Sequence, residues 1–300
     1  MLKPLALAAV LMFLVACGSD EPNVGSGSEA TGSGAAGDFD EPIPADVEAY
    51  PILVSSEIVA GDNRFLVGVL NGEDAPIGSL QIDVEADFFF LESSDTESVT
   101  SARFDFIETV PGERGLYVGH VTFDEPGSWG AEVSITGDGI DERLKVAFEV
   151  LETGSTPQIG ERPPALDTPT GDDVKKLSTI TTDAHPDPDF YELSIADALQ
   201  EPRPFVVVFA TPKFCSSAVC GPTLDIVKDV APDFPKINFL HVEVYTNLDD
   251  PSDLKVVPAV KKWGLPTEPW VFVVDERGRV AAKYEGTVAA SELEGELKGL

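Results

Sequence analysis

Two cysteines, Cys215 and Cys220, are the residues of this chain whose type and spacing best suit chemistry. The chain has only three cysteines in 300 residues, and these two share the segment 206–222, which reads VVVFATPKFCSSAVCGP. An apolar strand there runs directly into a short polar turn that carries both thiols. Thiolates attack disulfides and bind soft metals. The pattern therefore indicates redox chemistry at the end of a buried strand.

The spacing of the two cysteines restricts where a helix can begin. Positions i and i+5 of a regular helix lie about 8.6 Å apart, whereas a disulfide tolerates about 7 Å between Cα atoms. Either Cys215 lies in the loop before the helix, or the first helical turn unwinds on oxidation. Pro222 favours the loop arrangement, because proline suits an early helical position. It could instead kink a helix that starts at Ser216.

The third cysteine, Cys17, ends a short apolar run over residues 5–15 that is followed by Ala16. A run of this length, after a weakly basic start, predicts a secretory signal over residues 1–17. Its Leu-Val-Ala-Cys ending resembles the lipobox of bacterial lipoproteins, which implies lipidation of Cys17. The alternative is an ordinary signal peptide with an incidental cysteine. Residues 18–44 are rich in Gly and Ser and predict a flexible acidic tether. We expect a protein anchored by its N-terminal lipid to the membrane of the bacterial cell envelope, extracytoplasmic, where disulfides persist.

The formal net charge of −33 bears on the partners of the protein. Nucleic-acid binding and binding to anionic lipid through a basic face are excluded, because both need clustered Lys and Arg. No Lys or Arg occurs between Lys3 and Arg64. The acidity is typical of a soluble or salt-adapted surface and assigns no activity.

Residues 45–151 read as a series of short strands. The segments 80–86, 116–123 and 129–135 alternate apolar and polar residues, and Gly137-Asp138-Gly139 is one of several turn signals between them. This spacing predicts an all-β sandwich. The segment 115–129 also resembles immunoglobulin-like accessory domains of secreted bacterial proteins. We find no catalytic cluster here, which favours a spacer or a binding module. A Pro-rich linker over residues 152–174 follows.

Residues 175–300 alternate strands with helical patterns and predict an α/β domain with a mixed sheet. The expected strands are 204–210, 238–244, 269–275 and 279–284, and the expected helices are 195–199, 223–234, 259–263 and 291–300. The fold class predicted for the whole chain is therefore two domains, with an N-terminal β-sandwich and a C-terminal α/β domain.

Three segments carry a resemblance to a known family: FATPKFC…CGP over 209–222, GLPTEP over 264–269 and DERGR over 275–279. Together they resemble the thioredoxin-like superfamily, in particular envelope thiol–disulfide oxidoreductases, over residues 156–300. The resemblance implies a thioredoxin fold for residues 175–300. It also implies that Cys215 is the nucleophile and Cys220 the resolving thiol. Pro269 takes the place of a cis-proline, for which Pro266 is the competing candidate.

The resemblance further implies a substrate groove lined by Pro269, Glu268 and Phe214. A helix N-terminus stabilises a thiolate, and Lys213 adds positive charge that would lower the thiol pKa. Two features depart from the family pattern. Four residues rather than two separate the cysteines, and Val208 stands where many members carry a buried acid.

These observations predict a thiol–disulfide oxidoreductase that acts on protein thiols or disulfides in the cell envelope, with no cofactor and no metal. One alternative is a non-enzymatic surface binding protein in which a Cys215–Cys220 disulfide is structural. Copper delivery ranks third, because it needs a third soft or imidazole ligand beside the two thiols. His185 and His241 lie in no recognisable metal-site motif.

Overall fold

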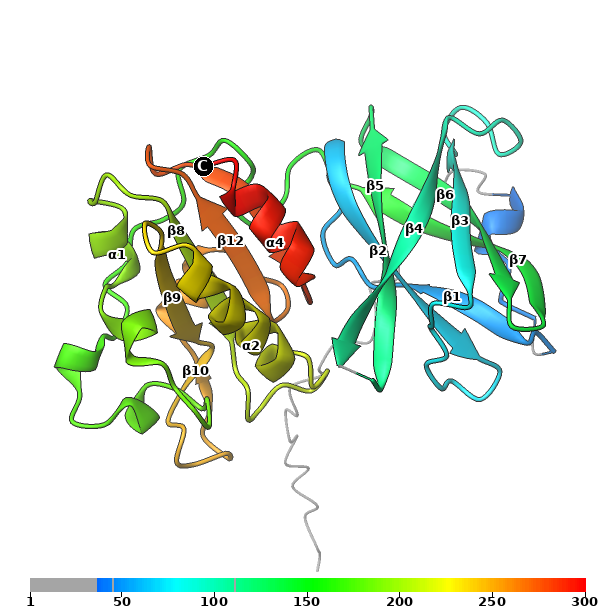
Figure 1. Ribbon diagram of the computed structural model, residues 1–300. Helices are drawn as coiled ribbons and strands as arrows, with labels where there is room; N and C mark the ends of the chain where they lie inside the picture. The colour runs from blue at the N-terminus through cyan, green and yellow to red at the C-terminus, as the bar shows by residue number, and fades with distance from the viewer. Residues whose placement is uncertain (1–36, 45, 111) are drawn as a thin grey trace, which may run out of the picture. The chain divides into compact units, whose positions relative to one another are not determined.

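The computed structural model of the protein describes residues 37–44, 46–110 and 112–300. In these residues a seven-stranded antiparallel sheet is followed along the chain by a four-stranded sheet (Figure 1). A 3₁₀ turn, η1, precedes the first strand. The bounds are η1 Gly37–Asp40, β1 Ala49–Leu53, β2 Gly61–Asn71, β3 Asp83–Phe90, β4 Thr100–Val110, β5 Arg114–Phe123, β6 Gly127–Gly137 and β7 Ile140–Val150.

The seven strands form one continuous sheet in the order β1-β2-β5-β4-β3-β6-β7. The sheet curls until its ends meet, because Ala60 N–H donates to Leu151 O (2.9 Å) and Leu151 N–H donates to Ile58 O (2.9 Å). Strands β6 and β7 join at Asp138 and Gly139, which both have positive φ, as a two-residue hairpin turn requires. The curled sheet nearly closes and encloses its own core.

Aromatic side chains fill this core. The rings of Phe65, Phe88 and Phe123 meet edge to face or tilted, with the Phe88 ring 5.3 Å from that of Phe65 and 5.4 Å from that of Phe123. Trp129 lies 4.9 Å from Phe123 and donates its indole N–H to Glu125 O. Each fully buried ring of this size contributes about 2 kcal/mol or more through removal from water. The alternation along β3 and β6 is thus explained by one face turned to this core.

The second sheet has the order β13-β12-β8-β9, in which only β8 and β9 run parallel. The helices α2 and α4 pack with the same face of this sheet (Figure 1). The bounds are η2 Gly171–Asp173, η3 Leu177–Thr179, η4 Pro188–Tyr191, α1 Ile195–Ala198, β8 Phe205–Ala210, α2 Cys220–Val230, η5 Ala231–Asp233, β9 Asn238–Glu243, β10 Tyr245–Thr246, β11 Lys255–Val256, α3 Pro258–Lys262, β12 Trp270–Val274, β13 Val280–Glu285 and α4 Ala290–Leu297.

Strand β8 is buried along its whole length because both faces of the sheet are covered. Val206 and Val208 pack with the core that α2 and α4 close, whereas Val207 packs with the core that α1 and α3 close. Side chains of a strand alternate between faces, so one apolar run serves both cores. The strand ends at Ala210 and delivers the cysteine loop.

The Pro-rich segment 152–170 follows the bridge residue Leu151 at the end of β7 and contains neither helix nor strand. A buried carboxylate holds this segment in place. The side chain of Glu57 is 2% exposed and pairs with Lys283 Nζ at 2.8 Å. It also accepts the hydroxyl and the N–H of Thr156 at 2.6 and 3.0 Å, and the side-chain N–H of Gln158 at 3.1 Å. Burial alone would raise the pKa of Glu57, but the hydrogen bonds and charge of Lys283 and Thr156 lower it to about 2.

The predicted fold class is corrected in its first half. The sequence predicted a sandwich of two packed sheets, whereas β4 pairs with both β3 and β5 and joins all seven strands into one sheet. Residue alternation reports that one face of a strand is buried but not which strand lies beside it. Phe39 also differs from the expected tether: it is buried and packs on Phe89 with 5.1 Å between ring centroids.

The second half is corrected as well, and with it the proposed resemblance to the thioredoxin-like superfamily. The described residues are predominantly β, with 37% in strands against 17% in helices, and the large sheet is antiparallel. Of the four α-helices among the described residues, α1 and α3 have four and five residues. Helical patterns of this length form single turns, because nucleation is costly and Pro258 and Gly264 bound α3 closely. No thioredoxin-like α/β fold is therefore assigned.

Candidate functional site

Cys215 and Cys220 are joined by a disulfide, with 6.0 Å between their Cα atoms. Helix α2 begins at Cys220, so Cys215 lies in the irregular loop between β8 and this helix. The loop brings the two Cα atoms within the distance that a disulfide tolerates, which a regular helix would not do. Pro222 occupies the third position of α2, where its missing N–H costs no helical hydrogen bond.

The two sulfurs have different surroundings. Cys220 is fully buried, whereas Cys215 is partly exposed in its loop. The backbone N–H of Cys220 points at Cys215 Sγ at 3.3 Å, and the Ser217 hydroxyl lies at the same distance from that sulfur. Donors at this distance favour the thiolate form of a sulfur. Cys215 Sγ, the more accessible sulfur, is therefore the one whose thiolate these donors would stabilise after reduction.

Phe214 and Lys213 lie next to the disulfide loop but form contacts of their own. The ring of Phe214 packs 6.5 Å from that of Tyr245, and Lys213 Nζ lies 5.1 Å from the Phe214 ring centroid. The backbone N–H of Lys213 donates to the hydroxyl of Thr182. No ion pair or hydrogen bond joins the Lys213 ammonium to Cys215 within the described ranges. The role of Lys213 in lowering the thiol pKa stays a prediction.

The Glu268–Pro269 peptide bond is cis, and Pro266 is not among the cis residues of the described chain. The carbonyl of Pro269 accepts the N–H of Gly286 at 2.8 Å. Gly286 O in turn accepts the hydroxyl of Thr223 at 3.0 Å, on the first turns of α2. These two bonds hold the proline, the end of β13 and the helix that begins at Cys220 together.

Glu268 lines a cavity of about 360 Å³ together with Ser217 and Val219 from the disulfide loop. Burial, and then the negative charge of Glu243, raise the pKa of Glu268. Among the described residues, no hydrogen bond or ion pair is found for its carboxylate. The structure therefore brings Glu268, Pro269 and the disulfide loop into one region, as the substrate groove requires, while Phe214 lies to its side against Tyr245.

Both ring nitrogens of His241, the buried histidine of β9, have hydrogen-bonding neighbours. His241 Nδ1 lies 2.7 Å from Tyr191 Oη and 3.3 Å from Thr181 Oγ1, and Nε2 lies 3.0 Å from Ala210 O. Burial lowers the pKa of His241. Within the described part of the chain, no group of three His, Cys, Asp or Glu side chains is placed to hold a metal ion. The ring is a structural part of the core and is not free to serve as the third ligand for copper.

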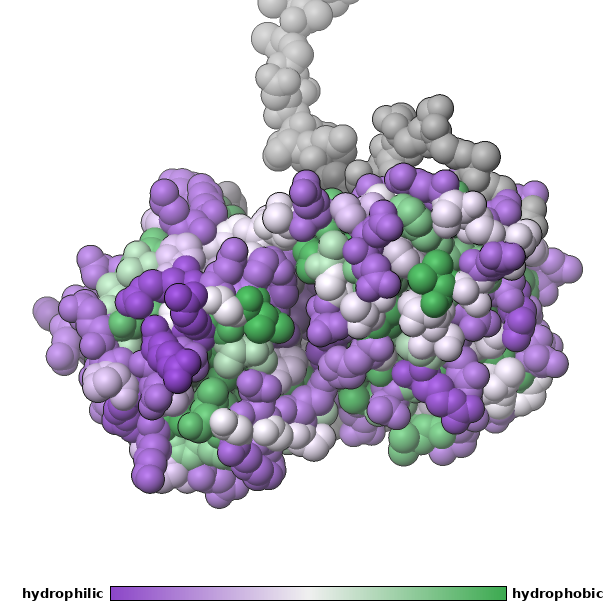
Figure 2. Space-filling model, turned by 90° about the horizontal axis from the view of Figure 1, so that it is seen from above, coloured by the Kyte–Doolittle hydropathy of each residue, from purple (hydrophilic) through white to green (hydrophobic). Residues whose placement is uncertain are grey.

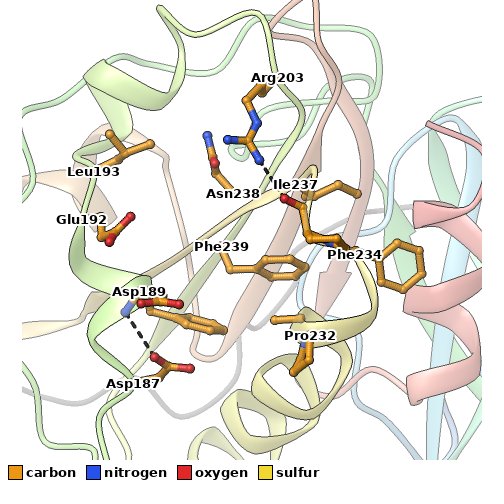
Figure 3. A pocket seen from close by; sticks show the side chains of 13 residues that line it. Asp187, Asp189, Glu192, Leu193, Arg203, Pro232, Phe234, Ile237, Asn238 and Phe239 are labelled. Atoms are coloured by element: carbon orange, nitrogen blue, oxygen red, sulfur yellow. Dashed lines mark hydrogen bonds between the residues drawn. The ribbon is translucent and has the colours of Figure 1, made fainter.

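A second pocket, of about 440 Å³, lies away from the cysteines, and Figure 3 shows it from close by. Asp187 accepts the N–H of Asp189 and caps η4. Arg203 donates to the carbonyls of Pro235 and Lys236. The charged groups of this pocket thus hold turns of the chain in place. Figure 2 shows that hydrophilic residues cover much of one face of the molecule, with smaller hydrophobic areas between them.

Two further groups were missed by the sequence analysis. The hydroxyls of Thr211 and Thr287 are buried and have no hydrogen-bond partner among the residues that the structure describes. Thr211 directly follows β8, and Thr287 lines the cavity beside Glu268. A threonine after a strand gives no local signal that its hydroxyl will lack a partner, because this depends on contacts from distant segments.

No family model matches this chain, and no curated protein matches it. Solved structures with some similarity include a DUF4426 family protein from Pseudomonas aeruginosa PAO1, at 8% identity and a TM-score of 0.24, over 35% of this chain and 90% of that one. MtrC from Shewanella baltica OS185 matches at 15% identity and a TM-score of 0.25, over 38% of this chain and 24% of that one. The Lin-41 filamin domain matches at 11% identity and a TM-score of 0.22, over 36% and 95%.

The description of the chain as a thioredoxin-like lipoprotein is corrected, because the described fold is predominantly β. A disulfide between Cys215 and Cys220 is present, but neither the comparisons nor the structure supports a lipoprotein, a signal peptide or an oxidoreductase family. Cys17, the expected signal over residues 1–17 and residues 18–36 of the expected tether lie outside the described residues. Where the chain is described, its helices are all too short or too polar to cross a membrane.

Proposed function

We propose that the protein exchanges its Cys215–Cys220 disulfide with the thiols and disulfides of other proteins. The observation that supports this proposal is the asymmetry of the pair, in which one sulfur is partly exposed and flanked by two donors while the other is buried at the start of α2. Exchange needs one sulfur that an external thiolate can reach and a second that can displace it. The pair has both features.

The small loop that the disulfide closes also argues for exchange over a purely structural role. A cross-link between residues five positions apart stabilises a fold by only about 2 kcal/mol in the chain-entropy treatment. It joins a loop to the helix that directly follows and links no distant segments. A structural disulfide gains most where it closes a long loop.

In the reduced protein, the Cys215 thiolate attacks one sulfur of a client disulfide. A bond between Cys215 and the client forms, and the client's other sulfur leaves as a thiolate. Cys220 then loses its proton and attacks Cys215, which forms the Cys215–Cys220 bond and releases the second client sulfur. Two electrons pass to the client, whose two thiolates take up two protons. The same steps run backwards oxidise a client dithiol.

The proposal requires a compartment in which disulfides persist, so it includes an extracytoplasmic location in the cell envelope. The competing hypothesis is a binding protein in which the disulfide is structural. Structural disulfides have reduction potentials below about −300 mV, whereas exchange catalysts lie between about −270 and −120 mV. The two hypotheses therefore differ in a single measurable property.

The test is the reduction potential of the pair in a Cys17→Ser protein, equilibrated with thiol–disulfide buffers. We expect a value between about −270 and −120 mV, and reaction of a protein disulfide that disappears in the matched Cys215→Ser variant. A value below about −300 mV, together with no reaction of client disulfides, would favour the structural role. Cys220→Ser provides the second control, because it should accumulate a mixed disulfide through Cys215.

A further inference from the structure

The cavity beside the disulfide loop has a wall from each of the two sheets. One side comes from the loop and from the segments at Thr267–Glu268 and Glu285–Thr287. The opposite side comes from the seven-stranded sheet and is mainly apolar, with Ile52, Val69 and Leu116 among its residues. Ile52 is an exposed aliphatic side chain and Leu116 is half-buried. The volume of the cavity, about 360 Å³, falls in the range of about 300–1,000 Å³ that is usual for ligand sites.

A polar atom without a partner lies in this cavity. Thr287 is 1% exposed and lines the cavity, and its hydroxyl makes no hydrogen bond among the described residues. Leaving such a group unpaired is unfavourable. Gly286, the residue before Thr287, accepts the hydroxyl of Thr223 and donates its N–H to the carbonyl of Pro269. Thr287 is therefore held next to the cis-proline segment, and Ser217 and Val219 of the disulfide loop line the same cavity. A molecule that enters the cavity can supply the missing partner.

The charges of the cavity limit what can enter. Glu268 and Glu285 both line it, and burial raises the pKa of each carboxyl. Arg114 is the basic residue of the lining, and it is half-buried. An acidic peptide would bring further negative charge next to two buried carboxyls, which is unfavourable. An uncharged aliphatic or aromatic side chain matches the apolar wall without this cost.

We propose that this cavity binds an aliphatic or aromatic side chain of the client polypeptide, next to the cysteine that exchanges with Cys215, while the Thr287 hydroxyl donates to a client backbone carbonyl. This inference rests on the proposed function and adds the class of substrate. It also gives the seven-stranded sheet a role, because its apolar residues select the client. Ser217 and Val219 link the cavity directly to the disulfide loop.

The test compares peptide disulfides that differ only beside the cysteine. The reduced Cys17→Ser protein reacts with a Leu-Cys-Leu, a Ser-Cys-Ser and a Glu-Cys-Glu peptide, each as a mixed disulfide with 2-mercaptoethanol, and with hydroxyethyl disulfide. We expect the Leu-Cys-Leu peptide to react about tenfold faster than Ser-Cys-Ser, as partial burial of an aliphatic side chain would give, and Glu-Cys-Glu to be the slowest. Hydroxyethyl disulfide has no side chain for the cavity and reports the reactivity of Cys215 itself.

Two variants assign the preference to the cavity. Leu116→Glu should abolish the preference for Leu-Cys-Leu, whereas its control Leu80→Glu, at a side chain 77% exposed and outside the cavity, should retain it. Thr287→Val keeps the shape of the side chain and should slow the peptides about fivefold relative to hydroxyethyl disulfide.

The outcomes separate the two proposals. Equal rates for the Leu and Ser peptides, a preference that survives Leu116→Glu, or peptide rates that Thr287→Val leaves unchanged would each overturn the client inference while exchange itself stands. If even hydroxyethyl disulfide fails to react, the proposed function is wrong. Far-ultraviolet circular dichroism of each variant identifies misfolding, and Thr287→Val, as the milder change, still decides the inference if Leu116→Glu does not fold.

Discussion

Glu57 and Thr287 are both buried near strand β13, but their surroundings differ. The carboxylate of Glu57 pairs with Lys283 and accepts hydrogen bonds from the segment 155–158. Thr287 has a buried hydroxyl with no partner, and the neighbouring Glu268 carboxylate makes no hydrogen bond within the described ranges. Paired buried groups stabilise one arrangement of the chain, whereas unpaired ones are sites where a ligand can supply the missing bonds. The difference distinguishes a structural cluster from a candidate binding site.

The largest expected effect is at Glu57. Glu57→Gln leaves the partly buried Lys283 ammonium without its counter-charge, so we expect a loss of about 3 kcal/mol in the free energy of unfolding. Glu132→Gln is the control, because the side chains of its partners Arg143 and Lys145 are 64% and 28% exposed and pairs of this kind contribute at most about 1 kcal/mol. Urea denaturation measures both. The double variant Glu57→Gln with Lys283→Met should recover part of the loss, and a simple sum of the two single effects would contradict a direct pairing.

The same pair gives the protein a dependence on acid. The pKa of Glu57 is about 2 in the folded protein, below its ordinary value of 4.5. Its contribution to stability is therefore complete above pH 4.5 and is lost as the pH falls toward 2, because the unfolded chain takes up the proton first. Glu57→Gln should flatten the acid side of the stability profile.

Glu268, in the cavity, has a pKa shift of the opposite sign to that of Glu57, because burial raises its pKa. Glu268→Gln should therefore not destabilise the protein at pH 7.

The same substitution, threonine to valine, can be made at Thr156 in the Glu57 cluster and at Thr287 in the cavity, and so compares a paired hydroxyl with an unpaired one. Thr156 is 3% exposed, and its hydroxyl lies 2.6 Å from Glu57 and 3.1 Å from Lys283 Nζ. Thr156→Val removes bonds to charged groups and should cost about 2 kcal/mol. Thr287→Val removes a hydroxyl that has no partner, so we expect the free energy of unfolding to stay constant or to rise. A loss at Thr287 as large as that at Thr156 would show that Thr287 is structurally paired.

Much of the secondary structure was predictable because it depends on local pattern. Alternation located the strands around 129–135 and the turn at Gly137–Gly139, which lie in β6 and at its hairpin. The sheet as a whole was not predictable, because β2 pairs with β5 across some fifty residues of sequence. Such pairings depend on side-chain packing between distant segments, which residue periodicity does not encode. The sandwich was therefore predicted where the chain forms one curled sheet.

The candidate site shows the same division. Cys215 and Cys220 were found from residue type and spacing. The spacing left a loop or an unwinding first turn open, and Pro222 favoured the loop that the structure contains. Thr287 could not be found, because whether its hydroxyl has a partner depends on which distant segments pack around it. The apolar wall from β1, β2 and β5 is likewise a product of tertiary structure.

The smallest expected effect concerns the charge beside the disulfide. Ser217 lies within 3.3 Å of Cys215 Sγ, whereas the Lys213 ammonium rests over the Phe214 ring and is exposed. In the reduced Cys17→Ser protein, Lys213→Ala should raise the pKa of the Cys215 thiol only slightly, because solvent screens an exposed charge. Ser217→Ala removes a direct donor and should raise it more. The pH dependence of alkylation by iodoacetamide measures both. If Lys213→Ala raises the thiol pKa more than Ser217→Ala does, long-range charge rather than direct hydrogen bonding controls the stability of the Cys215 thiolate. The contrast between paired and unpaired groups would then not apply to this sulfur.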